Sequence, residues 1–221
     1  MAELLPLFPL QTVLFPQMLM PLHIFEPRYR LLVKRALESE RPFGIVAIRS
    51  GEEIGAGAEP YAVGTEAKIE AFSPLPDGRS YIVVRGLRRF RIERRMDDVE
   101  PYLVGDVGYL GEVEGDDAAP RAAAAIEAYG QYVVAVMAVT DDERGDRAIV
   151  DELATVTPGE AAYRIAASLA IDASERQRLL EAPTAADRLA SERQLLERET
   201  SLLRDLLVRL RAHGEGRAPL N

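Results

Sequence analysis

Short apolar runs interrupted by proline dominate the beginning of the chain. Residues 4–29 hold five prolines, and the first basic residue, Arg28, comes after all of them. Proline breaks helices and lacks a backbone N–H, so it confines such a run to edge strands, bulges and turns. We therefore predict short strands here. A secretory leader would need a basic start and an uninterrupted apolar core, and we expect none; no apolar run reaches the length of a transmembrane helix.

Short-range alternation continues to about residue 110. Residues 43–48 are apolar and end at Ser50-Gly51, as a buried strand does. Leu75-Pro76-Asp77-Gly78-Arg79 predicts a turn between strands near 63–73 and 80–86. Pro27 suits the first position of a helix, and apolar residues follow it with helical spacing. Many short strands with one helix predict a small, mixed barrel.

The period becomes helical after an acidic, glycine-containing stretch at 111–120. Thr157 and Glu160 have the spacing of a capping box, and Asp172 and Thr184 begin two related signatures. In the last helix four leucines fall seven residues apart, at 189, 196, 203 and 210. A two-chain coiled coil would need apolar residues at its second core position, where this chain has Glu192 and Glu199. We therefore predict packing within a helical bundle in preference to a dimer zipper.

These patterns predict an α+β fold with two domains. A small β-barrel with one helix occupies residues 1–112, a linker 113–120, a helical bundle 121–213 and a flexible tail 214–221.

Composition excludes several kinds of chemistry. The 221 residues include no cysteine, which excludes disulfides, thiolate nucleophiles and cysteine-based metal sites and favours the cytoplasm. Neither Lys34 nor Lys68 lies in a phosphate-binding loop, and no protease motif is present. His23 and Glu26 are three residues apart, but flanking prolines argue against one helix face, so we expect a structural His23 and no metal site. We predict no cofactor and no enzyme.

One segment could contact nucleic acid, the arginine-rich stretch 79–95. Alternation places Phe90 and Ile92 on one face of a strand and Arg89 and Arg91 on the other. The net charge is −9 and residues 1–110 are nearly neutral, so ion pairs on a solvated strand explain the arginines better than RNA does. An RNA-binding face at Arg89 and Arg91 is the alternative.

Five segments in order resemble one family. They are Leu5-Pro6-Leu7-Phe8-Pro9-Leu10, Val13-Leu14-Phe15-Pro16, residues 21–29 (PLHIFEPRY), residues 63–67 (VGTEA) and residues 86–92 (GLRRFRI). Together they resemble the N-terminal, substrate-recognition domain of the ATP-dependent Lon protease, and the resemblance continues at 101–104, 166–169 and 175–181. It implies a PUA-like β-barrel followed by a helical bundle. The ATPase and protease modules have no counterpart, so the chain is similar to stand-alone proteins of this family, and no catalytic residue carries over.

The resemblance implies a non-catalytic module that binds polypeptides. We expect unfolded or specific polypeptides as partners, a separate protease or ATPase as a further partner class, no membrane, and a monomer or weak dimer. Flexible methionine and leucine side chains suit promiscuous surfaces. We predict an exposed apolar patch beside turns at Leu10, Phe15 and Met18.

Overall fold

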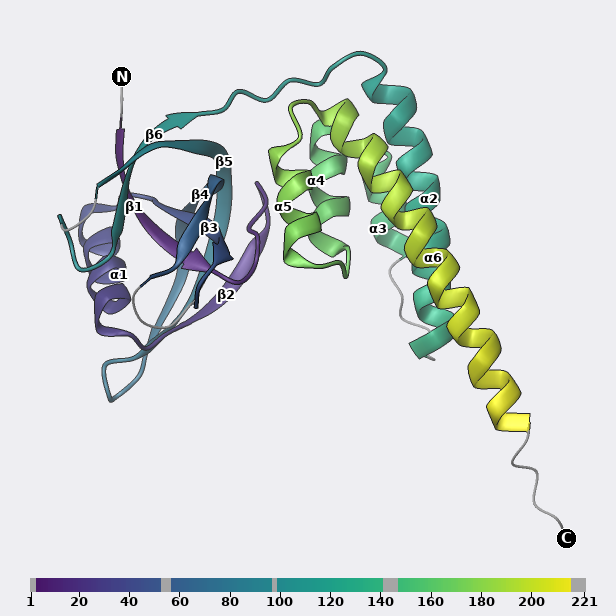
Figure 1. Ribbon diagram of the computed structural model, residues 1–221, viewed down its shortest axis with the longest axis horizontal. Helices are drawn as coiled ribbons and strands as arrows, with labels where there is room; N and C mark the ends of the chain where they lie inside the picture. The colour runs from purple at the N-terminus through teal and green to yellow at the C-terminus, as the bar shows by residue number, and fades with distance from the viewer. Residues whose placement is uncertain (1–2, 53–56, 97–98, 141–146, 216–221) are drawn as a thin grey trace, which may run out of the picture. The chain divides into compact units, whose positions relative to one another are not determined.

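The described residues form a mixed six-stranded sheet and six helices (Figure 1). The computed structural model describes residues 3–52, 57–96, 99–140 and 147–215. The strands are β1 (Glu3–Leu10), β2 (Leu19–Ile24), β3 (Phe43–Ser50), β4 (Glu59–Pro74), β5 (Ser80–Met96) and β6 (Leu103–Tyr109). The helices are α1 (Pro27–Ser39), α2 (Ala118–Thr140), α3 (Arg147–Leu153), α4 (Pro158–Ser168), α5 (Ala173–Glu181) and α6 (Ala185–Glu215).

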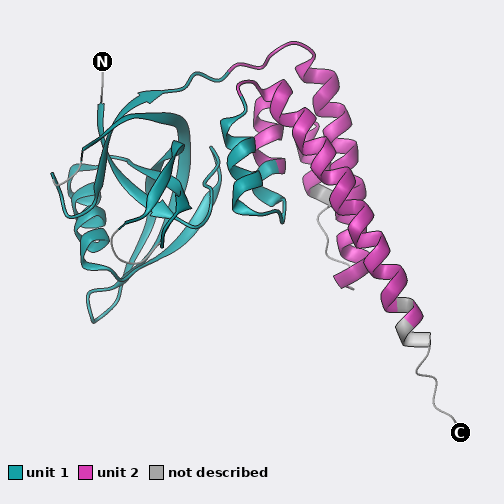
Figure 2. Cartoon of the chain, in the orientation of Figure 1, with its two compact units in different colours: residues 1–112, 166–182 teal, residues 113–165, 183–221 magenta. Residues whose placement is uncertain are grey.

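The chain divides into two compact units (Figure 2). Unit 1 is Met1–Glu112 with Ala166–Ala182, and unit 2 is Val113–Ile165 with Pro183–Asn221. Residues 166–182, which contain α5, cluster with the sheet and not with the other helices. The predicted linker 113–120 overlaps α2, which begins at Ala118, and most of the predicted tail lies outside the described residues.

In unit 1 the strand order is β2-β5-β4-β3-β1-β6. Because β6 also pairs with β5, the five strands β5, β4, β3, β1 and β6 form a closed ring of paired strands. β1 and β3 are parallel, and the other pairs are antiparallel. A large core cluster lies between the sheet and α1, where the Phe8 and Tyr29 rings stack 4.0 Å apart. The predicted hairpin is confirmed: β4 and β5 are joined by a turn in which Gly78 has φ +81° and donates its N–H to the Leu75 carbonyl.

Helix α5 is attached to the sheet by polar side chains that are themselves buried. Arg89 on β5 is 2% exposed, and its guanidinium donates to the carbonyls of Leu180 and Ala182, each at 2.8 Å, at the C-terminal end of α5. The same guanidinium pairs with Glu112 at 2.8 Å. From α5, Gln177 donates to the Val63 carbonyl at 3.0 Å. The last carbonyls of a helix lack partners within the helix, so these bonds satisfy groups that burial would otherwise leave unpaired.

The solvated arginine face predicted for β5 is therefore wrong at Arg89. Arg89 and Phe90 are both buried, although they point to opposite faces of the strand. The physical reason is that the interior covers one face of β5 here and α5 covers the other. Arg91 is exposed, as expected.

In unit 2, α2 packs along α6, and the predicted leucine stripe is buried in its first half. Leu189 and Leu196 are fully buried, Leu203 is half-buried and Leu210 is 52% exposed. The predicted caps form: the Thr157 hydroxyl accepts from the Glu160 N–H at 3.3 Å. The Asp172 carboxylate accepts from the Glu175 N–H at 2.8 Å. The hydrogen bond from the Ser174 hydroxyl, followed by that from the Glu175 N–H, lowers the pKa of Asp172.

Helix α2 is long and apolar enough to cross a bilayer, judged by length and composition alone. This corrects the expectation that no segment reaches that length. Core helices that never meet lipid pass the same test, and the buried face of α2 already includes Ala125, Tyr129 and Tyr132. Its composition is therefore only a weak indication of a membrane.

The interior of unit 2 also contains ionisable side chains. Arg188 and Glu192, one turn apart on α6, are both fully buried, and the Arg188 guanidinium lies 4.1 Å from the centre of the Tyr163 ring. Both carboxyl oxygens of Glu192 are buried, and neither has a hydrogen-bond partner among the residues that the structure describes. Burial raises the pKa of Glu192 well above its ordinary value, and the positive charge of Arg188 opposes that shift.

Replacing Glu192 with Gln is expected to stabilise the protein more at pH 8 than at pH 5. The pKa of Glu192 in the folded protein lies above its ordinary value of 4.5. The stability that depends on this group is therefore fully present below pH 4.5 and is lost as the pH rises through the folded-state pKa. Glutamine keeps the shape and cannot ionise. We expect a gain in Tm of about 2–6 °C at pH 8 by thermal denaturation. The exposed Glu197→Gln serves as control, and an equal gain at both pH values would contradict the prediction.

Replacing Arg89 with Met is expected to lower the free energy of unfolding by about 2–4 kcal/mol, because two buried carbonyls lose their donor. Urea denaturation measures the change. Arg91→Met on the same strand is the matched control, expected to stay within about 0.5 kcal/mol of the parent. Equal effects of the two substitutions would show that the buried hydrogen bonds contribute nothing.

Candidate functional site

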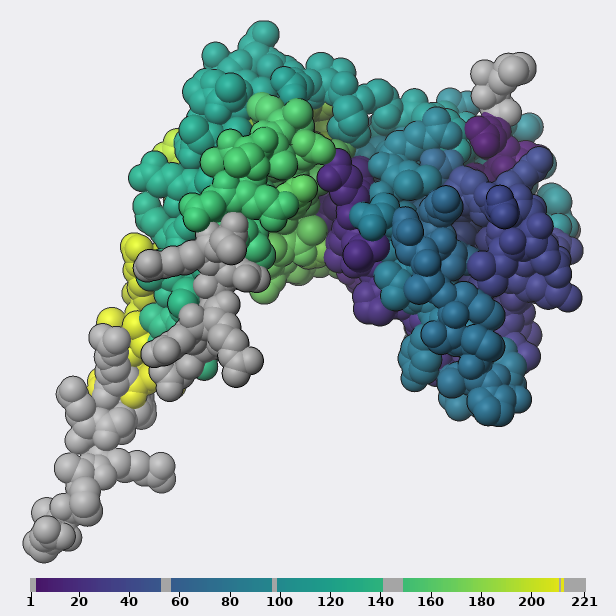
Figure 3. All heavy atoms as spheres, turned by 180° about the vertical axis from the view of Figure 1, so that it is seen from behind, coloured from purple at the N-terminus to yellow at the C-terminus, as the bar shows by residue number. Residues whose placement is uncertain are grey.

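An apolar groove lies between helix α1 and the β4–β5 hairpin, both in unit 1. The hairpin projects beyond the rest of the sheet in Figure 1, and its atoms form the lower lobe of unit 1 in Figure 3. The groove has a volume of about 690 Å³. Its apolar lining comes from Leu31, Val33 and Leu37 of α1 and from Phe72 and Pro74 of β4.

Two large apolar side chains of this groove are open to solvent. Leu37 is 38% exposed and Phe72 is 45% exposed, whereas Val33 beneath them is buried in the core cluster. Exposed apolar side chains that gather in a concave site gain free energy when a ligand removes them from water, at about 25 cal/mol per Å². The groove can therefore accept apolar side chains of a partner.

The rim of the groove is mainly cationic, with Arg30, Lys34 and Arg79 against Glu38. Lys34 and Glu38 approach to 3.8 Å and are both well exposed. Arg79 pairs with Asp77 at 2.6 Å. The hydrogen bond from the Arg79 backbone N–H is the largest cause that holds the pKa of Asp77 below its usual value; burial opposes it, and the Arg79 side chain adds to it. Gly78 lies against the end of the Arg30 side chain, and its φ of +81° is a backbone conformation that favours glycine.

A second set of exposed aromatic rings lies on β2 and β5. His23 stacks on Tyr81 with ring centres 4.7 Å apart, and Phe25 lies 5.6 Å from His23. Phe25 is 43% exposed and Tyr81 is 52% exposed. Glu26, which the sequence placed near His23, accepts from Arg28 at 3.1 Å. Within the described ranges no group of three or more His, Cys, Asp or Glu side chains could hold a metal ion.

The exposed patch predicted at Leu10, Phe15 and Met18 is not found where it was expected. Leu10 is 4% exposed, Phe15 is fully buried and Met18 is half-buried against the core cluster. The Arg176 guanidinium of α5 lies 5.2 Å from the centre of the Phe15 ring and donates weakly to the Met18 sulfur. These residues are covered because α5 folds back onto the sheet, which residue-by-residue patterns do not reveal.

The arginines of β5 are mostly engaged with carboxylates. Arg88 bonds to Glu66 at 2.9 Å, and the Tyr109 hydroxyl donates to the same carboxylate at 2.6 Å. Arg85, Arg94 and Arg95 pair with Glu70, Asp106 and Glu59. This agrees with the ion-pair explanation. Of the two residues offered for RNA, Arg89 is buried and only Arg91 could reach a ligand.

Sequence reasoning missed the groove. Phe72 lies in a predicted strand, next to a correctly predicted turn, and strand alternation alone cannot tell an interior phenylalanine from one that runs past the end of the core. The useful signal would have been the length of the hairpin, because β3 pairs with β4 only as far as Ala67 and leaves Phe72 and Pro74 beyond it.

Comparison with known proteins assigns this fold to a family. Residues 4–198 match the family model described as the ATP-dependent protease La (LON) substrate-binding domain. The chain is 26% identical over 208 residues to the Lon protease of Cytophaga hutchinsonii, covering 91% of this chain and 25% of that protein. It is 30% identical over 193 residues to the Lon protease of Xanthomonas oryzae pv. oryzae, covering 84% of this chain and 22% of that protein. The chain thus spans about a quarter of the length of these relatives.

Two solved structures have the same fold. The Lon N-terminal domain protein from Xanthomonas campestris aligns with a TM-score of 0.61 and 28% identity, over 88% of this chain and 98% of that one. The N-terminal domain of the Mycobacterium avium complex Lon protease aligns with a TM-score of 0.64 and 22% identity, over 90% and 98%. The family model matches most of the sequence, and the fold of the solved neighbours is the same: the chain belongs to the Lon substrate-binding domain family.

Proposed function

We propose that this protein is a non-catalytic polypeptide-recognition module whose groove between α1 and the β4–β5 hairpin takes apolar segments of unfolded chains. Membership of the substrate-binding family supports a role in recognition. The observation that carries the choice of surface is the pair of exposed side chains, Leu37 and Phe72, facing one concave site of about 690 Å³. We also infer that the closed strand pairings correspond to the PUA-like barrel that the sequence suggested.

The chemistry of the groove suits such a role. Its floor is apolar and its charges lie at the rim, so a ligand would be held mainly by removing its side chains from water and would not need one fixed sequence. The cationic rim would favour segments with acidic residues beside the apolar ones. A separate protease or ATPase that acts on the bound polypeptide is part of this proposal, as is a cytoplasmic location.

The double variant Leu37→Ser, Phe72→Ser is expected to weaken binding of a fluorescently labelled, permanently unfolded polypeptide about tenfold or more, because apolar anchors in a concave site carry most of the affinity. Fluorescence anisotropy at physiological salt measures the Kd. Both side chains are exposed, so the Tm should change by less than about 2 °C.

Leu206→Ser in unit 2 is the matched control, because Leu206 is 43% exposed, close to the value for Phe72. Equal loss of affinity in the control and the double variant would remove the groove as the site. A labelled single-stranded RNA titrated in parallel tests the alternative: RNA binding that falls steeply with salt and with Arg91→Gln would argue for it.

A further inference from the structure

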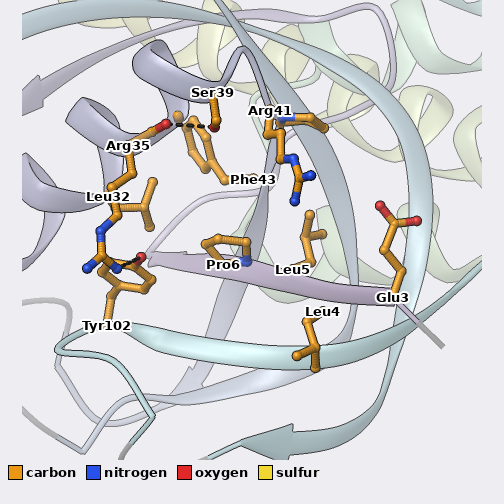
Figure 4. Close-up of a pocket in the computed structure, with 12 residues that line it drawn as sticks. Glu3, Leu4, Leu5, Pro6, Leu32, Arg35, Ser39, Arg41, Phe43 and Tyr102 are labelled. Carbon is orange, nitrogen blue, oxygen red and sulfur yellow. Dashed lines mark hydrogen bonds between the residues drawn. The ribbon is translucent and has the colours of Figure 1, made fainter.

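A second pocket of unit 1 lies beside the beginning of β1 and is also lined by α1 (Figure 4). Its volume is about 670 Å³. It combines an apolar floor, cationic side chains and strand backbone. Its lining residues include Glu3–Pro6 of β1, Leu32 and Arg35 of α1, Arg41–Phe43 before and at the start of β3, and Tyr102.

The strand backbone in this pocket has an unpaired edge. β1 pairs with β6 from Glu3 to Leu7, but its pairing with β3 begins only at Leu7. Within the described residues, no strand therefore pairs with Glu3–Pro6 along the edge of β1 that faces β3. Arg41 and Phe43 line the pocket just before β3 meets β1, which places the pocket on that unpaired side (Figure 4). Such an edge is a template for an extended peptide.

The two arginines of the pocket differ in how they are engaged. Arg35 is paired with Glu100 at 2.7 Å and donates to the Tyr102 hydroxyl at 2.8 Å. Arg41 is exposed, and its side chain makes no ion pair or hydrogen bond with the described residues. Figure 4 shows its guanidinium directed toward Leu5 on β1. Because Glu100 compensates Arg35, Arg41 is the cation left to bind an anion next to the unpaired edge.

The floor below is apolar. Leu5 is 2% exposed, Leu32 is 1% exposed and Phe43 is fully buried, yet all three border the pocket. A ligand that uses every feature needs an anionic end, an extended backbone with free hydrogen-bonding groups and an apolar side chain close to the anion. The C-terminus of a polypeptide has all of these. An internal segment lacks the carboxylate, and an inorganic anion could not use the strand edge.

We propose that this pocket binds the free C-terminal carboxylate of extended polypeptides that end in an apolar residue. Arg41 pairs with the carboxylate, the Glu3–Leu5 edge hydrogen-bonds to the ligand backbone, and the last side chain rests on Leu5, Leu32 and Phe43. The assignment rests on the proposed function, since it names a class of polypeptide that the module selects.

The test uses a labelled ten-residue peptide that ends in leucine, compared with the same peptide carrying a C-terminal amide. We expect the acid to bind about tenfold more tightly, because a charge-assisted hydrogen bond is lost with the amide. Arg41→Gln should lower the affinity for the acid to that for the amide and leave the amide unchanged. Arg91→Gln, an exposed arginine of the same unit, should change neither.

Backbone methylation of the peptide tests the strand edge. Methylating the nitrogen of the residue before the C-terminus removes a donor and blocks close pairing, and we expect about a fivefold or greater loss in affinity for the acid. If methylation had no effect, edge pairing would be wrong.

The outcomes separate this inference from the proposed function. Equal binding of acid and amide, lost in the Leu37→Ser, Phe72→Ser variant, would overturn the carboxylate pocket and leave the groove standing. Acid-dependent binding that Arg41→Gln abolishes and the groove variant does not would support the pocket alone. Binding of the unfolded polypeptide without any binding of either peptide would also overturn the inference.

Discussion

Unit 1 depends on one physical constraint, the need to pair every backbone carbonyl that becomes buried when α5 covers the sheet. Arg89 donates to the carbonyls of Leu180 and Ala182, and Gln177 donates to that of Val63. Arg176, itself partly buried, donates to the Leu169 carbonyl at 3.0 Å, and burial lowers its pKa. Guanidinium and amide groups are suited to this role because each presents several donors in a fixed plane. A helix taken from late in the chain thereby becomes part of the unit formed by residues 1–112.

The same contacts decide which apolar residues remain available for binding. Because α5 covers the segment around Phe15, that segment contributes to stability and is closed to ligands. Helix α1 has 13 residues, and its first turns lie beside the hairpin turn, where Arg30 approaches Gly78. Phe72 lies beyond Ala67, the last residue of β4 that β3 pairs, and it lines the same groove as Leu37. The pocket at β1 lies where a strand partner is missing. β3 pairs with β1 only from Leu7 onward, and the chain between α1 and β3 does not pair with residues 3–6.

The interior of unit 2 combines apolar side chains with ionisable ones. Its helices bury alanines along α2 and leucines along the first half of α6, and among them lie Arg188 and the unpartnered carboxyl group of Glu192. A buried carboxyl group is tolerated because it can keep its proton, which makes the stability of this unit depend on pH. Along the second half of α6 the leucine repeat becomes progressively exposed, since Leu203 is half-buried and Leu210 is 52% exposed.

Local structure was determined by the sequence alone. Pro27 at the first turn of α1, Gly78 at a positive φ and the caps at Thr157 and Asp172 were all predicted, because each depends on residues within a few positions of one another. The family could also be identified, since five short motifs keep their order. The tertiary structure alone decided which residues are covered. Arg89 and Arg91 have the same alternation and the same chemistry, yet α5, about 90 residues later, buries one and leaves the other exposed. Burial depends on what packs against a face from elsewhere in the chain, and a local pattern carries no record of that distant partner.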